Sequence, residues 1–152
     1  MINKGDLLIS TPESLGDYYF NRSIVILTEV SDEEVVGFII NKELNYTLSD
    51  LDNKVLEKNI KIFSGGPVNQ DNLYFIHKYP HLIDNSINFF NDLYWGGDFK
   101  KIIEMINKMK IDYSSIKFFS GYSGWTYNQL IGEVNNGSWV IVKNKANCIF
   151  KR

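Results

Sequence analysis

Short apolar runs separated by polar segments set the pattern of this chain. Residues 24–29 and 35–41 are two such runs, and the polar segment 31–34 between them predicts an antiparallel hairpin. Gly37 inside the second run indicates a bulge or a close approach of another backbone segment. Apolar and aromatic residues also predict strands at 7–10, 61–63, 73–77, 86–90, 116–119 and 138–142, and a strand end at 93–95.

Helical periodicity occurs at three places. Thr47 is expected to begin a short helix, with Asp50 in its first turn. Asp98 is expected to begin a second helix, whose apolar residues recur at the spacing i, i+3, i+4, i+7. The third helix follows Thr126, which forms a predicted capping box with Gln129. Because strands outnumber helices and short turns join several of them, the sequence predicts an α+β fold with a mainly antiparallel sheet.

Two glycine segments are the most unusual features of the sequence. Gly121-Tyr122-Ser123-Gly124-Trp125 follows an apolar run and precedes the Thr126 cap, which predicts a glycine loop between a strand and a helix. Gly65-Gly66-Pro67 predicts a tight turn after the run 61–63. If the two preceding strands are parallel neighbours, both segments emerge at one edge of the sheet and form one surface.

The residues around these glycines favour no catalytic chemistry. Ser120 and Ser123 are misspaced for the Gly-x-Ser-x-Gly turn that exposes a nucleophilic serine. A phosphate-binding loop requires a lysine that the segment lacks. Two interpretations of the 121–125 segment remain: the glycines permit a tight turn and close packing, or the following helix start attracts a carboxylate or phosphate.

The sequence also lacks the residues that a metal or cofactor site would require. His77 and His81 are the two histidines, and Cys148 is the single cysteine, whereas a zinc site takes three or four ligands with Cys or His among them. His77 ends an apolar run, so we expect it to be hydrogen-bonded to the backbone. No metal and no cofactor are predicted.

Length and charge limit the number of domains and the kinds of partner that are expected. At 152 residues, the chain is expected to form one domain over residues 1–152. The net charge is −2, and Arg22 and Arg152 are the arginines, so direct binding of duplex DNA is not expected. The first residues do not form a signal peptide, and no apolar run reaches the ~20 residues of a membrane helix. We therefore expect a cytoplasmic protein without membrane contact.

Several short motifs resemble the YqgE/AlgH family of bacterial proteins, whose members carry Gly-Tyr-Ala-Gly-Trp followed by Gln-Leu. The matching segments are Gly5 to Pro12, 17–23, Gly65 to Val68, Leu73 to His77, Gly96-Gly97, Gly121 to Trp125 and Gln129-Leu130. The family usually has Ala at the position of Ser123, which argues against a nucleophilic role. The resemblance runs from Gly5 to about Val142 and implies a branched sheet, partly closed into a small barrel-like part, with about three helices around it.

The family is often labelled a transcriptional regulator, and the resemblance implies no established reaction. Two function classes follow: a non-catalytic regulatory or interaction module, or an enzyme acting on a small molecule in a pocket near the two glycine segments. We favour the module, with an unknown protein partner or small ligand; no residue pattern predicts the oligomeric state. The candidate surface comprises Arg22, Asn41, Gly65, Gly66, Pro67, His77, Gly121, Tyr122, Gly124 and Trp125.

Within this surface, Arg22 and Tyr122 are the residues expected to contact a ligand. Arg22 would supply a forked cation suited to a carboxylate or phosphate. Its alternative role is an internal ion pair with Asp17 or Glu29. Trp125 is expected to be buried as a hydrophobic staple before the helix, which leaves Tyr122 as the better contact.

Overall fold

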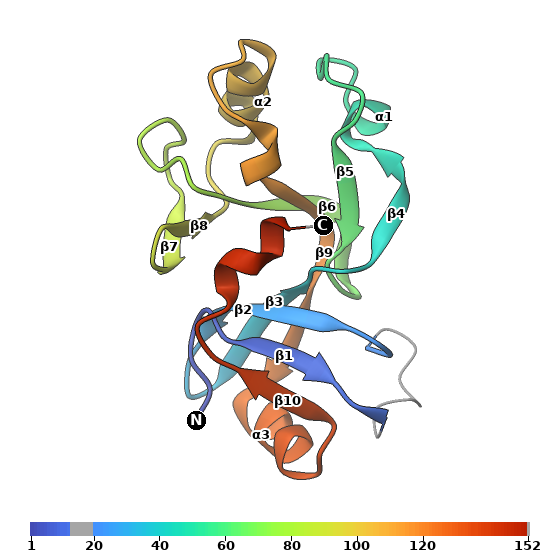
Figure 1. The fold of residues 1–152 in the computed structure, drawn as a ribbon, viewed down its shortest axis with the longest axis vertical. Coiled ribbons are helices and arrows are strands. Elements are labelled where there is room, and N and C mark those ends of the chain that lie inside the picture. The colour runs from blue at the N-terminus through green and yellow to red at the C-terminus, as the bar shows by residue number, and fades with distance from the viewer. Residues whose placement is uncertain (13–19, 152) are drawn as a thin grey trace.

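The computed structural model describes residues 1–12 and 20–151, and a single branched sheet of ten strands forms its frame (Figure 1). The strands are β1 (Leu7–Ser10), β2 (Ile24–Val30), β3 (Glu34–Ile39), β4 (Glu43–Thr47), β5 (Lys61–Ser64), β6 (Val68–His77), β7 (Ile87–Phe90), β8 (Leu93–Trp95), β9 (Lys117–Thr126) and β10 (Trp139–Val142). The helices are α1 (Leu48–Leu51), α2 (Phe99–Asn107) and α3 (Tyr127–Asn135), with short 3-10 helices η2 (Tyr113–Ser115) and η3 (Ala146–Phe150).

The pairing of the strands explains the branch. Along the main path the order is β10-β1-β2-β3-β9-β6-β8-β7, and β5 joins β9 from the side with β4 at its far edge. Among the described strands, β5 and β9 are parallel, and every other pair is antiparallel. The predicted α+β class with a mainly antiparallel, branched sheet is therefore confirmed.

The resemblance implied that the sheet is partly closed into a barrel-like part. This expectation is wrong, because the sheet does not close. Closure requires a continuous ladder without edges. In the described part of the chain, β4, β7 and β10 each pair on one side only, so three edges stay open. No helix in the same part of the chain is long and apolar enough to cross a membrane.

Strand β9 is the central element, and it corrects the predicted glycine loop at 121–125. It runs along the long axis of the molecule and connects the two halves (Figure 1). Its first half lies between β5 and β6, and its second half pairs with β3. Gly121 adopts a φ of 72° inside the strand, where the register with β6 shifts between Val68 and Leu73. The glycine thus marks a bulge in a strand rather than its end.

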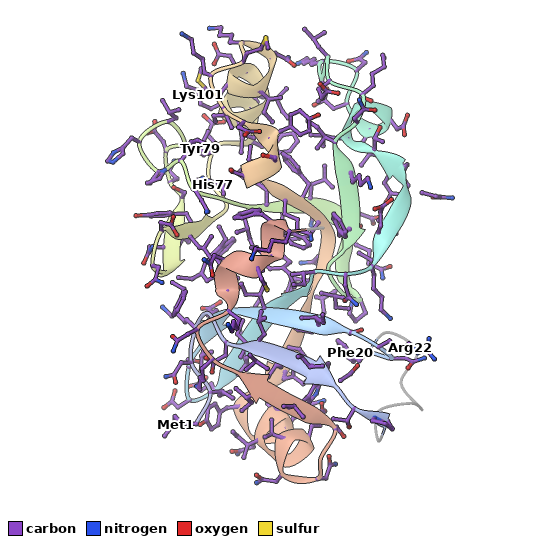
Figure 2. All side chains as sticks on the ribbon, in the orientation of Figure 1. Met1, Phe20, Arg22, His77, Tyr79 and Lys101 are labelled. Carbon is purple, nitrogen blue, oxygen red and sulfur yellow. The ribbon has the colours of Figure 1, made fainter. Side chains whose placement is uncertain are left out.

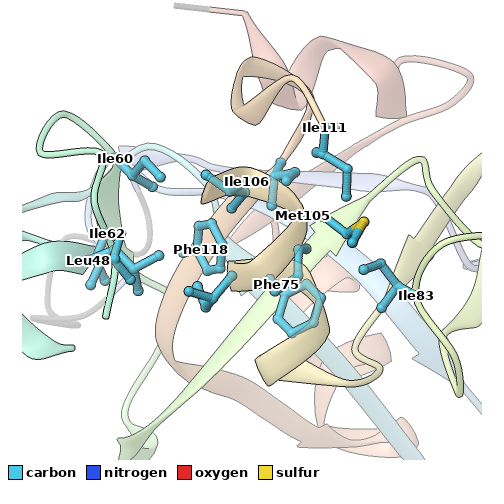
Figure 3. Packing of buried hydrophobic residues seen from close by; sticks show 13 residues of the cluster. Leu48, Ile60, Ile62, Phe75, Ile83, Met105, Ile106, Ile111 and Phe118 are labelled. Atoms are coloured by element: carbon cyan, nitrogen blue, oxygen red, sulfur yellow. The ribbon is translucent and has the colours of Figure 1, made fainter. Parts of the chain in front are cut away.

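Three groups of buried side chains pack against the sheet. One lies between α2 and the strands β5, β6 and β9, where Met105 and Ile106 approach Phe75 and Phe118 (Figure 3). A second gathers on another part of the sheet under η3, which contributes buried Ile149. The third packs α3 against β1, β2 and β3. Buried Ala146 and Ile149 therefore anchor η3 to the sheet.

The helix starts agree with the sequence. The Thr126 hydroxyl accepts the backbone N–H of Gln129 at 3.1 Å, as the capping prediction requires. The amide of Gln129 contacts Glu133 at 3.2 Å and leaves the second half of the capping box unformed. Asp98 accepts from the N–H of Lys101 at 3.2 Å. Thr47 is the N-cap of α1, and its N–H donates to the carboxylate of Asp50 in the first turn at 2.8 Å, so all three expected helix starts are confirmed.

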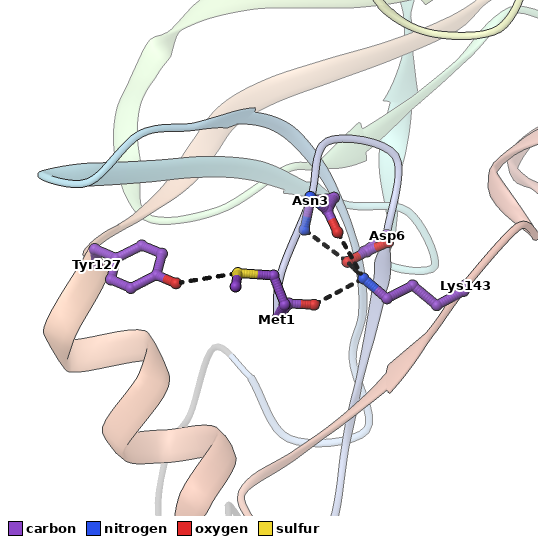
Figure 4. A network of polar contacts seen from close by, with 5 residues as sticks. All are labelled: Met1, Asn3, Asp6, Tyr127 and Lys143. Carbon is purple, nitrogen blue, oxygen red and sulfur yellow. Dashed lines mark hydrogen bonds and ion pairs between the residues drawn. The ribbon is translucent and has the colours of Figure 1, made fainter.

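A polar network ties the beginning of the chain to the end of β10 (Figure 4). The Lys143 ammonium lies 2.6 Å from the buried carboxylate of Asp6 and also donates to the Met1 carbonyl and the Asn3 side chain. The Asp6 carboxylate accepts the Asn3 N–H at 2.7 Å. Because both charges are partnered, Asp6 is accommodated in the interior next to β1.

Candidate functional site

The two glycine segments lie side by side, as their parallel strands predict. Ile62, Phe63 and Ser64 of β5 pair in register with residues 118–120 of β9. The Gly65 N–H continues this ladder by donating to the Ser120 carbonyl at 2.9 Å. A Cβ on Gly65 would collide with the Gly121 carbonyl oxygen, and one on Gly66 would collide with the Tyr122 carbonyl. The glycines therefore permit two backbones to touch, which favours the close-packing interpretation.

The serine hydroxyls in this region hold the same contact together. The Ser123 side chain is buried and donates to the Gly65 carbonyl at 3.0 Å. The Ser120 hydroxyl donates to the Gln70 carbonyl at 2.7 Å. Each hydroxyl proton is thus engaged by a backbone oxygen, as expected for residues that stabilise the packing of β9 against its neighbours.

A hollow of about 410 Å³ opens beside Tyr122, between β3, the second half of β9 and the start of α3. Tyr122 is half-buried, and its ring packs edge-on against Tyr74 at 5.6 Å between centroids. Trp125 is 5% exposed and packs in the cluster that contains Leu130, in agreement with the staple prediction. The exposed lining residues are Glu33, Glu34, Gly124, Thr126 and Gln129. Two carboxylates at this rim oppose the binding of an anion.

Arg22 lies at a different place from Tyr122. Its side chain is exposed and extends from the edge of the molecule (Figure 2), beside Ser10, Asn21 and neighbouring residues. Its backbone has a φ of 53°. The Asn41 side-chain amide donates a hydrogen bond to the Arg22 carbonyl at 2.9 Å and holds this backbone in place. No ion pair joins Arg22 to Glu29 among the described residues, and Asp17 lies outside them. Arg22 and Tyr122 thus line separate hollows, and their joint surface stays a prediction.

Asn41 and Pro67 complete the predicted set. The Asn41 side chain also accepts the Ile24 N–H at 2.9 Å, so it ties the segment that follows β3 to the start of β2. Pro67 is exposed at the turn between β5 and β6. Asn41 thus acts within the fold, whereas Pro67, like Tyr122 and Gly124, faces solvent near the glycine segments.

His77 belongs to the core and not to a surface. It is 0% exposed, and its Nδ1 accepts the Tyr79 N–H at 3.0 Å. Its Nε2 therefore carries the proton and donates to the Gly96 carbonyl at 3.0 Å. Burial lowers the pKa of His77 below its ordinary value, although the bond to Gly96 opposes this shift. The predicted backbone-bonded histidine is confirmed, and its place in the candidate surface is corrected.

A cavity that the sequence did not indicate lies between η3 and the strands β4, β5 and β9. Its volume is about 340 Å³. The lining residues are Ile40, Asn41, Glu43, Lys61, Phe63, Ser114, Ile116, Lys117, Ile149, Phe150 and Lys151. Part of this lining could be inferred from the local sequence. Lys61 and Phe63 are two residues apart in β5, so their side chains leave the strand on the same face. In the described part of the chain, no group of three His, Cys, Asp or Glu side chains is arranged to hold a metal.

Comparison with known proteins identifies the family. The model of a family described as AlgH-like matches residues 7–152. This chain belongs to the AlgH-like family. An AlgH-like relative in Cytophaga hutchinsonii, named UPF0301 protein, is 39% identical over 142 residues, covering 93% of this chain and 78% of the relative. A UPF0301 protein of Bacteroides fragilis is 39% identical over 150 residues, covering 95% of this chain and 74% of the relative.

Two solved structures share the AlgH-like fold. The AlgH protein of Pseudomonas aeruginosa has a TM-score of 0.78 at 20% identity, covering 97% of this chain and 80% of that one. A protein of Corynebacterium diphtheriae has a TM-score of 0.74 at 21% identity, covering 93% of this chain and 76% of that one. The resemblance inferred from the short motifs is confirmed, and it extends over nearly the whole chain.

Proposed function

We propose that this AlgH-like chain is a non-catalytic interaction module, regulatory in role, that binds a positively charged segment of a partner protein beside Tyr122. The observation that carries the proposal is the hollow of about 410 Å³, in which a tyrosine ring lies next to two exposed carboxylates. Such a combination matches the two parts of a lysine or arginine side chain, an apolar stem and a cationic end.

The hydrogen bonds made by the potentially reactive side chains support a non-catalytic role. Ser120 and Ser123 donate their hydroxyl protons to backbone carbonyls, and both ring nitrogens of His77 are hydrogen-bonded inside the core. The hollow that adjoins the two glycine segments is lined by none of these three residues. The groups that sequence reasoning considered for chemistry therefore stabilise the fold.

Charge and shape support a basic protein segment as the partner. The carboxylates of Glu33 and Glu34 are exposed at the rim, while Val36, Val68 and Tyr122 supply half-buried apolar surface. Each exposed ion pair contributes little, typically about 0.2–1 kcal/mol, so binding requires the apolar stem as well as the charge. A net charge of −2 agrees with a basic protein partner and opposes direct contact with DNA phosphates.

The test begins with co-purification from native cells and identification of the partner by mass spectrometry. The basic segment of that partner is then titrated, as a synthetic peptide, into the wild-type chain and into the double variant Glu33→Lys, Glu34→Lys. Hydrogen bonds of this turn involve the backbone of both glutamates and the Ser31 hydroxyl, so the fold should survive the charge reversal. We expect at least tenfold weaker binding by calorimetry.

The matched control is Asp92→Lys, a reversal at a carboxylate that is 68% exposed on the far hairpin of β7 and β8. This control should bind the peptide like wild type. Equal affinity of wild type and the double variant at low salt would refute the role of the hollow, as would an equal loss in the Asp92→Lys control.

A further inference from the structure

The turn at the end of α2 presents a basic and apolar projection to the solvent. It consists of Lys108, Met109 and Lys110, all three of which are exposed. We propose that this projection binds the hollow beside Tyr122 of a second copy of this chain. The inference rests on the proposed function, because it uses the same hollow, and it names a competitor for the partner protein.

Hydrogen bonds hold the backbone of the projection in one shape. The N–H of Met109 donates to the Ile106 carbonyl at 3.0 Å. The N–H of Lys110 donates to the Met105 carbonyl at 2.9 Å. The next residue, Ile111, is buried in the same cluster as the apolar face of α2. A segment that is already ordered loses less entropy on binding than a flexible one.

A neighbouring loop supports this end of α2. The Asn107 side chain donates to the Lys54 carbonyl at 2.8 Å and accepts the Leu56 N–H at 3.0 Å. The loop between α1 and β5 is thereby fastened to the end of the helix, and its Leu56 side chain is largely exposed. This end of the molecule therefore combines exposed apolar side chains with a fixed backbone.

Backbone preference does not account for a methionine at position 109. Its φ of 58° is left-handed, and the same position after α3 is Gly137. Because Met109 is 90% exposed, packing within its own chain offsets little of this strain. An unbranched thioether side chain adapts well to an irregular apolar surface. The hollow supplies such a surface in the half-buried side chains of Val36, Val68 and Tyr122.

The charges of the two surfaces are complementary. Glu33 and Glu34 are exposed at the rim of the hollow. Among the described residues, no ion pair joins Lys110 to a carboxylate. Lys108 lies 2.9 Å from Glu104 of its own helix, but exposed ion pairs are weak, so this lysine can exchange its partner. A methionine between two lysines thus matches an apolar hollow with two carboxylates.

Two molecules are needed to bring these surfaces together. Helices α2 and α3 lie at opposite ends of the long axis (Figure 1), and the hollow lies beside the start of α3. The contact is therefore head to tail. It joins unlike surfaces, so a pair of copies retains one projection and one hollow for further copies. At high concentration, the copies would occupy the hollow and exclude the partner protein.

The experiment uses two variants that lack opposite halves of the contact. The projection variant, Met109→Asn with Lys110→Glu, retains the hollow, and asparagine tolerates the left-handed conformation. The hollow variant, Glu33→Lys with Glu34→Lys, retains the projection. All four side chains are exposed, so both variants should keep the fold. The projection variant is labelled with ¹⁵N, and unlabelled chains are titrated into it.

Two unlabelled chains of equal net charge provide the comparison. One adds the projection changes to the hollow variant. The other adds Lys100→Glu, which reverses an exposed lysine at the start of α2. With the Lys100→Glu chain, we expect saturable shifts of the hollow amides, those of Tyr122 and Gly124. Affinity for the chain without the projection should be at least tenfold weaker. Equal affinities would overturn the proposal, and so would the absence of shifts at millimolar concentrations.

The results also separate this inference from the proposed function. The projection variant should bind the basic peptide of the partner protein like wild type. If that peptide binds while the two variants do not bind each other, the second-copy inference alone fails. If the variants bind each other while charge reversal at Glu33 and Glu34 leaves the peptide affinity unchanged, the partner role of the hollow fails instead.

Discussion

The ends of α2 and α3 provide a matched test of what a left-handed backbone conformation costs when the residue is not glycine. Both helices end in the same motif, in which the residue after the cap takes a left-handed conformation. In α2 this residue is Met109, with a φ of 58°, and in α3 it is Gly137, with a φ of 86°. The N–H of the residue that follows donates to the carbonyl of Met105 or Glu133, respectively. One position thus carries a side chain where the other has the favoured glycine.

The size of the effect follows from the surroundings of the two residues. A left-handed conformation costs an L-residue roughly 1–2 kcal/mol, while glycine gains more freedom in the unfolded chain, by about 0.4–1 kcal/mol. Met109 is 90% exposed, so its removal loses little packing. A Cβ on Gly137 would meet nothing within 4 Å, so only the backbone opposes it. We therefore expect Met109→Gly to stabilise and Gly137→Ala to destabilise the chain, each by about 0.5–1 kcal/mol.

Urea and thermal unfolding of the two variants and their combination provide the measurement. A change of about 1 kcal/mol corresponds to a shift of roughly 2–4 °C in melting temperature for a domain of this size. The two helices lie at opposite ends of the long axis (Figure 1), so the double variant should return close to wild type. A destabilised Met109→Gly variant would refute the reasoning, because it would show that the Met109 side chain contributes more than its backbone costs.

Three further predictions concern the cap, the histidine and the glycine contact. Thr126→Ala should cost about 1 kcal/mol in urea melts, since it removes the acceptor for the Gln129 N–H. Burial lowers the pKa of His77 from 6.5 in the folded chain, so stability should fall as the pH drops below 6.5. The decrease should be at most about 1.4 kcal/mol per pH unit and absent in His77→Gln. Gly66→Ala should cost more than about 2 kcal/mol, whereas exposed Gly124→Ala, whose Cβ finds its closest contact at 3.7 Å, should be nearly neutral. Equal melting temperatures of these two glycine variants would contradict the close-packing interpretation.

Local patterns predicted the elements well where one face of a strand or helix is buried. The runs at 24–29 and 61–63 and the caps at Thr126 and Asp98 follow from hydrophobicity and short-range hydrogen bonds alone. The extension of β6 did not follow, because residues 69–72 are polar and typical of a loop. They lie in the register shift between the pairs Val68–Tyr122 and Leu73–Ser120, where β6 meets a partner strand about fifty residues later, and their side chains are exposed.

The candidate site was predicted less well, because surface neighbours depend on long-range pairing. The adjacency of the two glycine segments followed from their parallel strands, and this part of the reasoning is confirmed. Arg22 was placed near Tyr122 because it precedes a strand and belongs to a family motif, but the two residues line separate hollows. The cavity under η3 brings together residues from 40 to 151, and no local pattern relates residues so far apart in the sequence.

The contact between the glycine segments gives the first glycine of the Gly-Tyr-x-Gly-Trp motif, Gly121, a physical reason. The first half of β9 pairs with β5 and β6, and its second half pairs with β3. Three partner strands must therefore approach β9 near Gly121. Side chains at Gly65, Gly66 and Gly121 would prevent this approach, since each Cβ would overlap a backbone oxygen. Phe63 lies two residues before this contact and Tyr122 directly after it. The binding region proposed beside Tyr122 therefore borders this close backbone contact, and a partner that binds a surface already in place loses less entropy than one that must first order it.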